Sequence, residues 1–307
     1  MSMVENKHFH HPPFQIAMEG FSFTLPPDWE VGGYELNDPL HSGILSFTEI
    51  GTAMGQFSWR KVKDIPDIPR IIEEIHRRWL VSDVTPNIRF TRYGKDGKVV
   101  LAHTKMNERF YAAVFNRKMM FLCEWIFPKY SKENAERVVP MLESFSENDP
   151  DKDTGRTNFS LFGLEVSIPA GYHFLELTPY PAAVTMDFEN IKHYKISVHR
   201  FGMADVYMQG ADTANFYHRC LYARKYAIKD VKTIPPVNGC EAAEILYQAR
   251  GKFGFDFLLG PWWCGFGSAF LKSSENRVYA FEHLASRFFK ERETLKNIFR
   301  KKLSGKG

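Results

Sequence analysis

The feature of this chain that most constrains its fold is a twelve-residue pattern that occurs twice. Residues 20–31 read GFSFTLPPDWEV, and residues 163–174 read GLEVSIPAGYHF. In each copy a glycine opens an alternating apolar segment, a proline closes it, and an aromatic residue follows three positions after the proline, at Trp29 and Tyr172. The copies lie 143 residues apart, close to half of the 307 residues. The sequence therefore predicts a tandem duplication of one domain.

The length and composition agree with two domains of ordinary size. The chain has 44% hydrophobic, 15% aromatic and 25% charged residues, which is typical of a globular protein with sizeable cores. A polar stretch with a proline and a glycine separates the two copies and is expected to be a linker. The predicted parts are a lead-in at 1–19, a first repeat at 20–146, a linker at 147–158 and a second repeat at 159–303.

Hydrophobic periodicity predicts strands and helices in the same order in both repeats. In the first repeat, strands are predicted at 21–25, 43–48, 55–62, 88–92, 98–103, 109–115 and 119–126. A helix with one buried isoleucine stripe is predicted near 68–79, and Ser131 is expected to cap a second helix that runs to 145. In the second repeat, strands are predicted near 162–168, 182–189, 194–201, 241–248 and 277–284, with helices near 212–227 and 288–302.

This order of elements resembles that of the PsbP-like/Mog-like domains. The residues that carry the resemblance are the two strand ends FTLPPDW at 23–29 and VSIPAGY at 166–172, with Pro26 and Pro169 at equivalent places. The resemblance implies an α+β fold: two tandem alpha/beta/alpha sandwich domains, each a central antiparallel sheet flanked by helices. It also implies a non-catalytic role in binding a protein partner or assisting the assembly of a complex.

Several classes of function lack the residues that they need. No GxSxG, HExxH, Walker or dinucleotide-binding motif occurs, so we expect no enzyme activity and no cofactor. His8, His10 and His11 lack a partner at fixed spacing, so no metal site is expected. The net charge of +4 is too balanced to favour nucleic acid. With no secretory signal, no long apolar run and no CxxC spacing among four cysteines, we expect a cytoplasmic protein with free thiols and no transmembrane segment.

Three groups of charged residues are candidates for binding or catalysis. Two basic pairs, Arg60-Lys61 and His199-Arg200, follow alternating strands and predict exposed strand ends. Asp187 and Glu189 share one face of a strand, where they could do acid/base work but are expected to form outward salt bridges. Residues 287–306 are strongly basic, which predicts a helix that docks on the core with a solvated basic face or, alternatively, one that rests on anionic lipid or nucleic acid.

The sequence places the recognition site in the segment that only the second repeat contains. The distance from the hairpin glycine to the last strand is 21 residues in the first repeat and 38 in the second, and the 17 extra residues fall around 251–267. The predicted binding residues of this aromatic, glycine-rich insertion are Phe255, Phe257, Trp262, Trp263, Cys264 and Phe266. Aromatic side chains between glycines can form an adaptable contact surface for a protein partner.

Two other interpretations of the insertion stay open at this stage. It could line a pocket for a small-molecule ligand or an enzyme site, with Cys264 as a nucleophile if His283 or His218 lay beside it. It could instead pack between the two repeats as internal structure.

Overall fold

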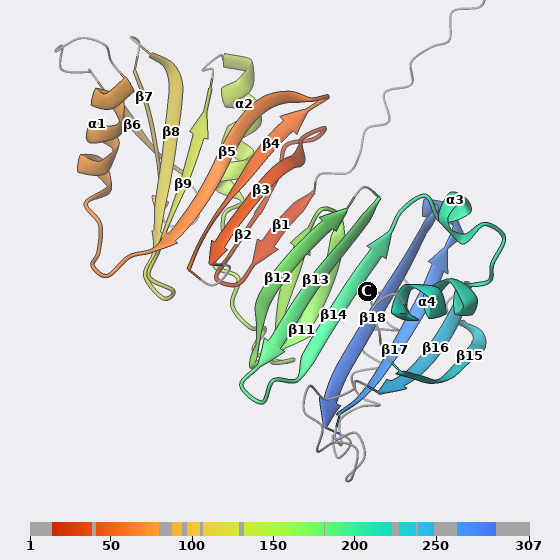
Figure 1. Cartoon of the computed structure of the whole chain (residues 1–307). Helices are drawn as coiled ribbons and strands as arrows, with labels where there is room; N and C mark the ends of the chain where they lie inside the picture. Colours follow the sequence, from red (N-terminus) through yellow and green to blue (C-terminus); the bar gives the residue numbers. More distant parts are fainter. Residues whose placement is uncertain are drawn as a thin grey trace, which may run out of the picture. The chain divides into compact units, whose positions relative to one another are not determined.

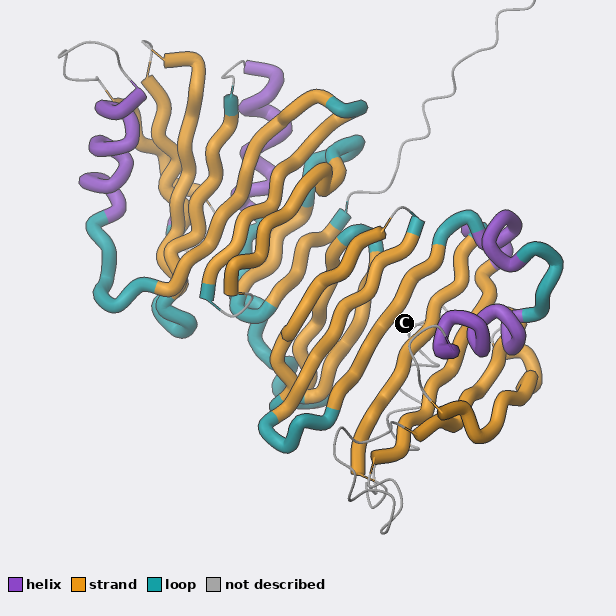
Figure 2. The backbone as a smooth tube through the Cα atoms, in the orientation of Figure 1, coloured by secondary structure: helices purple, strands orange, loops and turns teal. Residues whose placement is uncertain are grey.

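The computed structural model describes residues 14–38, 41–79, 88–93, 97–104, 107–128, 132–180, 182–222, 227–237, 239–248 and 263–286. The chain forms two compact units (Figure 1). The first comprises Met1–Asp149 and Phe159–Gly163, and the second comprises Pro150–Asn158 and Leu164–Gly307. Strands make up most of both units, as Figure 2 shows.

The first unit is built on a seven-stranded antiparallel sheet with the order β3-β4-β5-β9-β8-β7-β6. Its strands are β3 (Glu30–Asp38), β4 (Ser42–Glu49), β5 (Thr52–Lys61), β6 (Ile88–Tyr93), β7 (Val99–Thr104), β8 (Asn107–Asn116) and β9 (Phe121–Phe127). Helix α1 (Ile68–Trp79) packs on one face of this sheet. Its fully buried Ile72 lies among Ala102, Tyr111 and Leu122, as the predicted isoleucine stripe requires.

Strands as well as a helix pack on the other face of the first sheet. Strands β1 (Gln15–Met18) and β2 (Phe21–Thr24) form a hairpin, β10 (Arg156–Leu161) pairs with β1 through Ser160 and Ala17, and α2 (Lys132–Glu143) packs on β2. The Phe23 ring centroid lies 4.9 Å from that of Phe57 and 5.7 Å from that of Trp125. Aromatic packing between two strand layers therefore holds this side together.

The second unit contains a seven-stranded antiparallel sheet with the equivalent order, β12-β13-β14-β18-β17-β16-β15. Its strands are β12 (Tyr172–Tyr180), β13 (Ala183–Asn190), β14 (Lys195–Phe201), β15 (Ala227–Val237), β16 (Cys240–Gln248), β17 (Trp263–Lys272) and β18 (Arg277–Ser286), with β11 (Leu164–Pro169) preceding them. The remaining elements are the helices α3 (Ala204–Met208) and α4 (Thr213–Tyr222) and the 3-10 turn η2 (Ser273–Glu275). Helix α4 lies on β15, β16 and β17 (Figure 1).

The predicted α+β class with two alpha/beta/alpha sandwiches is wrong. The structure is dominated by antiparallel sheets, and the helices of its described part are short, with 12 residues each in α1 and α2, 5 in α3 and 10 in α4. The sequence reading missed several strands, among them β3, β12 and β15. In addition, β2 was expected to belong to a helix-flanked sheet, but it forms part of a second strand layer. The sheets are therefore larger and the helical layers smaller than expected.

Three local predictions of the second repeat also need correction or lie outside the described residues. The helix predicted at 212–227 ends at Tyr222, and strand β15 begins at Ala227. The predicted insertion at 251–267 ends inside strand β17, which begins at Trp263. Residues 249–262 and the helix predicted at 288–302 lie outside the described residues. Among the described residues, no helix combines the length and the apolar character that crossing a bilayer requires.

Candidate functional site

The structure describes only part of the predicted recognition site. Phe255, Phe257 and Trp262 lie outside the described residues. Trp263 begins β17, and the half-buried Cys264 follows it, with Gln248 and Ala285 as its neighbours on the adjacent strands. Phe266 is fully buried, and its ring centroid lies 5.9 Å from that of Phe281 and 5.4 Å from the ring of His283. Phe266 therefore belongs to the core and is not available at the surface.

The glycines at the end of the predicted insertion make room for tyrosine rings. A β-carbon on Gly265 would lie 2.0 Å from the ring of Tyr247, and one on Gly267 would lie 2.3 Å from the hydroxyl oxygen of Tyr217. Both tyrosines are almost fully buried, and they come from β16 and α4. These two glycines therefore allow buried tyrosines to pack closely inside the second unit. They do not form part of an adaptable surface loop.

Exposed apolar side chains gather instead on the short helix α3 and on the residue that precedes it. Met203, Val206 and Tyr207 are 51%, 53% and 48% exposed. Val206 and Tyr207 lie three and four positions after Met203, which precedes the helix, and they form its exposed side. The other side carries Ala204 and Met208, which are buried against the core of the second unit. In consequence, α3 is apolar on both its buried and its exposed side.

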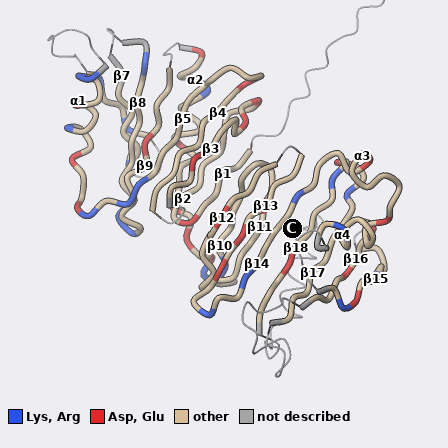
Figure 3. The backbone as a smooth tube through the Cα atoms, viewed as in Figure 1, with Lys and Arg blue, Asp and Glu red and all other residues tan. Residues whose placement is uncertain are grey.

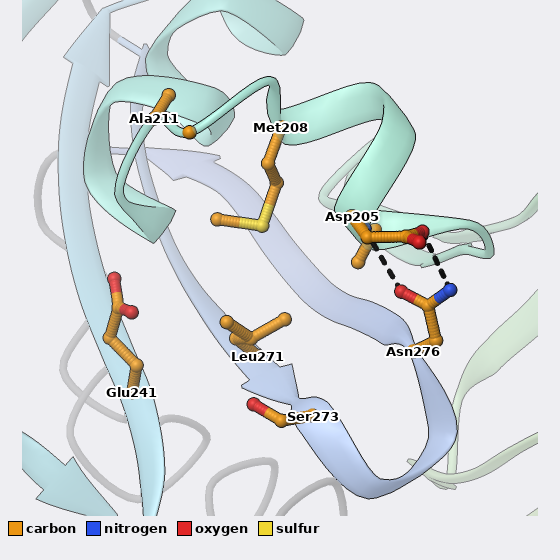
Figure 4. A pocket seen from close by; sticks show the side chains of 9 residues that line it. Asp205, Met208, Ala211, Glu241, Leu271, Ser273 and Asn276 are labelled. Atoms are coloured by element: carbon orange, nitrogen blue, oxygen red, sulfur yellow. Dashed lines mark hydrogen bonds between the residues drawn. The ribbon is translucent and has the colours of Figure 1, made fainter.

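Hydrogen bonds to the turn between β17 and β18 hold α3 in place. The backbone N–H of Asp205 donates to Asn276 Oδ1 at 2.9 Å, and Asn276 Nδ2 donates to Asp205 Oδ1 at 2.6 Å (Figure 4). The backbone N–H of Ala204 donates to the Asn276 carbonyl at 3.0 Å, and Arg219 donates to the Met208 carbonyl at 3.1 Å. These bonds satisfy groups at both ends of a helix that is too short to be stable alone.

The backbone on both sides of α3 adopts an uncommon conformation. Met203 and Gln209 flank the helix with φ values of 53° and 50°, in the left-handed region that non-glycine residues rarely occupy. Asn276, whose side chain anchors α3, has a φ of 53°. The segment is also specific to the second unit, because the chain between β5 and α1 of the first unit contains no helix.

A pocket of about 440 Å³ lies between α3 and the strand ends of the second sheet. Met208 and Leu271 are among its apolar lining residues, and Asp205, Glu241 and Asn276 contribute polar groups. In Figure 4, Glu241, near the start of β16, stands across the gap from Met208 and Leu271, and the Asp205 carboxylate on α3 is turned toward Asn276. Glu241 Oε1 accepts a hydrogen bond of 2.7 Å from the backbone N–H of Thr213 at the start of α4.

A buried polar network on the sheet of the second unit was a further candidate. Glu282 Oε1 lies 3.2 Å from His199 Nε2, and the Tyr247 hydroxyl donates to Glu282 Oε2 at 3.4 Å. His199 Nδ1 lies 2.8 Å from Thr185 Oγ1. The side chains of His199 and Glu282 are only 1% and 4% exposed. His199 is therefore not at an exposed strand end as the sequence analysis expected, and the network belongs to the interior.

The first unit places a similar network at the equivalent position of its sheet. Glu124 lies opposite Ser58, as Glu282 lies opposite Ser197. The Tyr111 hydroxyl donates to Glu124, and Arg60 Nε donates to Glu124 Oε2 at 3.2 Å. Burial and the nearby Glu124 carboxylate raise the pKa of Tyr111 well above its ordinary value. Because the network occurs in both units, it is better explained as part of the framework than as a specific site.

The two carboxylates predicted on one strand face have separate partners. Asp187 accepts a hydrogen bond from the Ser197 hydroxyl, and Glu189 Oε1 lies 2.8 Å from His193 Nδ1. Within the described part of the chain, no group of three or more His, Cys, Asp or Glu residues could hold a metal ion. Figure 3 shows acidic and basic residues distributed over both units.

Two solved structures show a weak likeness to this chain. No family model and no curated protein matches the chain. The apo structure of the immunity protein TplEi of the T6SS from Pseudomonas aeruginosa is similar over 94% of each chain, with 12% identity and a TM-score of 0.32. The isotype 1 transferrin binding protein B from serogroup B Neisseria meningitidis has 7% identity over 80% of this chain and 66% of its own, with a TM-score of 0.12. Neither TM-score is high enough to support an argument about fold or function.

Proposed function

We propose that the chain is a non-catalytic binding module that acts on a protein partner. The partner docks on the α3 surface, which we define as the exposed side chains of Met203, Val206 and Tyr207 together with the adjoining pocket. The observation that carries the proposal is that a five-residue helix, specific to the second unit, and the residue before it expose about half of each of three large apolar side chains. Grouped apolar exposure of this kind usually marks an interaction site.

The construction of α3 supports binding rather than a purely structural role. A helix that only covered the core would need apolar residues on one side, and Ala204 and Met208 already supply them. Tyrosine and methionine are enriched at protein interfaces, where they contribute contact area. The hydrogen bonds to Asn276 fix α3 before a partner arrives, and this lowers the entropy that binding must overcome.

Site-specific photocrosslinking in cells of the source organism tests the proposal. A benzophenone amino acid replaces Tyr207, and in a matched control it replaces Tyr180, which is 65% exposed on β12 of the same unit. We expect one discrete protein adduct from position 207 and none from position 180. The adduct should disappear when Val206→Asp is added, because a charge on the docking side opposes burial.

Val206→Asp is expected to leave the fold intact. The side chain is about half exposed, and an acidic residue is favourable in the first turn of a helix. Equal adducts from positions 207 and 180, or an adduct that survives Val206→Asp, would contradict the proposal. A thermal-shift screen with metabolites, run in parallel, covers a small-molecule ligand. A ligand that raises the melting temperature when no protein adduct forms also contradicts it.

A further inference from the structure

The four outer strands of the two seven-stranded sheets differ in how they are protected against pairing with another chain. A sheet edge presents unpaired backbone N–H and C=O groups, and proteins commonly block it with prolines, β-bulges or charged side chains. Strands β3, β12 and β15 each contain at least one register shift, and β12 and β15 also contain prolines. Strand β6, in contrast, pairs with β7 in an unbroken register over all six of its residues and contains no proline.

The outer edge of β6 has no partner strand in the part of the chain that the structure describes. Strand β6 is the last strand of the first sheet and lies beside α1 (Figure 1). In an antiparallel pair, only every second residue directs its N–H and C=O toward the neighbouring strand, so the alternate residues of β6 direct theirs away from β7. The four central side chains, from Arg89 to Arg92, are exposed, and Phe90 is 43% exposed. This edge is therefore accessible to a further strand.

The side chains of β6 determine which kind of strand can pair with it. Phe90 lies opposite Ala102, which packs against α1, so Phe90 and Arg92 share the face of the sheet that carries α1. Arg89 lies on the other face, and it forms no ion pair with any of the described residues. An added strand thus meets one arginine on each face, and acidic side chains opposite these arginines would stabilise the pairing.

The same charges argue against a second copy of this chain as the partner. In the antiparallel register that pairs all six residues of two β6 strands, Arg89 of each copy lies opposite Arg92 of the other. Like charges directly opposite one another are destabilising, so the pattern disfavours self-association and favours a different, acidic strand. Arg92 Nη1 donates to the Gly97 carbonyl at 3.3 Å, which leaves most of its five N–H donors available.

We propose that β6 is a second interaction site, at which an extended acidic segment of a protein partner adds to the first sheet as an antiparallel strand. Hydrogen bonds between the main chains provide affinity. Two acidic side chains of the segment, three positions apart, face Arg89 and Arg92 and fix the register, and a β-branched residue between them packs on Phe90. The site lies within the first unit and does not depend on the α3 surface of the second.

The experiment uses the full chain and short peptides as probes. In an antiparallel register, acetyl-Thr-Glu-Thr-Val-Glu-Thr-amide places its glutamates opposite Arg92 and Arg89 and its valine opposite Phe90. A control peptide has lysine in place of both glutamates. The backbone N–H signals of β6 are followed by NMR in deuterated, ¹⁵N-labelled protein. We expect saturable shifts of these signals and an affinity for the glutamate peptide at least about tenfold above that for the lysine peptide.

Two measurements distinguish an added strand from contact through side chains alone. Hydrogen exchange of the outward N–H groups, which belong to alternate residues of β6, should slow when the glutamate peptide is bound, while the N–H groups already bonded to β7 change much less. Two further peptides carry N-methyl groups on one or the other alternate set of their amides. Only the set that faces β6 donates to it, so one methylated peptide should lose binding and the other should keep it.

A charge reversal and a matched control test the role of the arginines. Arg89→Glu should lower the affinity for the glutamate peptide at least about fivefold and raise the affinity for the lysine peptide. Arg77→Glu makes the same change of charge on an exposed residue of α1, away from the strand edge, and should leave both affinities within about twofold.

Four results would each overturn the inference. They are the absence of a saturable shift in β6, equal affinity for the glutamate and lysine peptides, unchanged exchange of the outward N–H groups, and equal effects of the two methylation patterns. All four are measured on the unmodified protein, so they stay decisive even if Arg89→Glu fails to fold. None of them bears on the protein adduct at position 207, which tests the α3 surface separately.

Discussion

Replacing Ile50 by asparagine should make the first unit more stable. Ile50 and Gly51 form the two-residue tip of the β4–β5 hairpin, between the paired residues Glu49 and Thr52. Their φ values are 48° and 77°. A two-residue loop with two positive φ values favours Asn-Gly, whereas a β-branched residue is sterically disfavoured there.

The size of the effect follows from the backbone and from exposure. A non-glycine residue in the left-handed region costs about 1–3 kcal/mol, and asparagine tolerates it better than isoleucine. The Ile50 side chain is 87% exposed, so its removal loses little burial. We expect Ile50→Asn to raise the free energy of unfolding by about 1 kcal/mol, which shifts Tm by about 2–4 °C in a chain of this size.

The second unit contains a matched control for this substitution. Ile191 lies at the tip of the equivalent β13–β14 hairpin and is also 87% exposed, but it does not adopt a positive φ. Ile191→Asn should therefore change the free energy of unfolding by less than about 0.5 kcal/mol. Ile50→Val, which keeps the β-branch, should likewise bring no gain.

Urea unfolding followed by tryptophan fluorescence measures these differences. Trp29, Trp59 and Trp125 are buried in the first unit and report on its unfolding. A decrease in stability for Ile50→Asn, or an equal increase for Ile191→Asn, would refute the argument from backbone strain.

Three further predictions concern packing and charge. Gly265→Ala should lower the free energy of unfolding by about 1–3 kcal/mol, because the new β-carbon would overlap the ring of Tyr247. Gly33→Ala is the control in the same urea assay: its β-carbon would meet its neighbours at ordinary contact distances, so the free energy of unfolding should fall much less. Tyr111→Phe removes the hydrogen bond to Glu124 and should lower the free energy of unfolding at neutral pH by about 1.5–3 kcal/mol. The pKa of Tyr111 is raised in the folded chain, so above pH ~10 the hydroxyl ionises in the unfolded chain before it does in the folded one. The stabilisation from Tyr111 is therefore fully present below pH ~10 and decreases above it, and the free energy of unfolding of the wild-type chain should fall more than that of Tyr111→Phe between pH 9 and 11.

Local periodicity was enough to predict many elements of the first unit. The isoleucine stripe predicted α1, which begins at Ile68 and ends at Trp79. Strands β4, β5 and β9 also lie close to their predicted positions, because alternating apolar residues face the aromatic core. These elements owe their pattern to residues within a few positions of one another, so the pattern is visible in a single sequence.

The strands that were missed depend on partners that are distant in the sequence. Strand β15 contains Pro235 and Pro236 just before its last residue, Val237; prolines usually argue against a strand but are tolerated at the edge of a sheet. Strand β17 contains glycines that pack against tyrosines from α4 and β16. Without those tyrosines in view, the glycines of β17 indicated a loop.

The α3 surface was not predictable for a related reason. A five-residue helix is too short to show a hydrophobic period, and only the structure reveals which of its side chains are exposed. The comparison of the two repeats predicted a site in the second repeat, and that stays a prediction. The prediction chose 251–267 because this is the longest segment that only the second repeat contains. Among the described residues, exposed apolar side chains lie instead on a shorter additional segment around α3.

Both units contain the same buried contact, but the tyrosine that makes it comes from a different strand in each. In both sheets a tyrosine hydroxyl donates to the equivalent glutamate, Tyr111 to Glu124 in the first unit and Tyr247 to Glu282 in the second. The position on β17 that corresponds to Tyr111 is Gly265, and the ring of Tyr247, from the neighbouring strand, occupies the space that this glycine leaves. The second unit thus has a glycine where the first has a tyrosine, and its tyrosine lies on the next strand. Independent sheets have no reason to preserve such a contact, so it supports the predicted duplication, which stays a prediction.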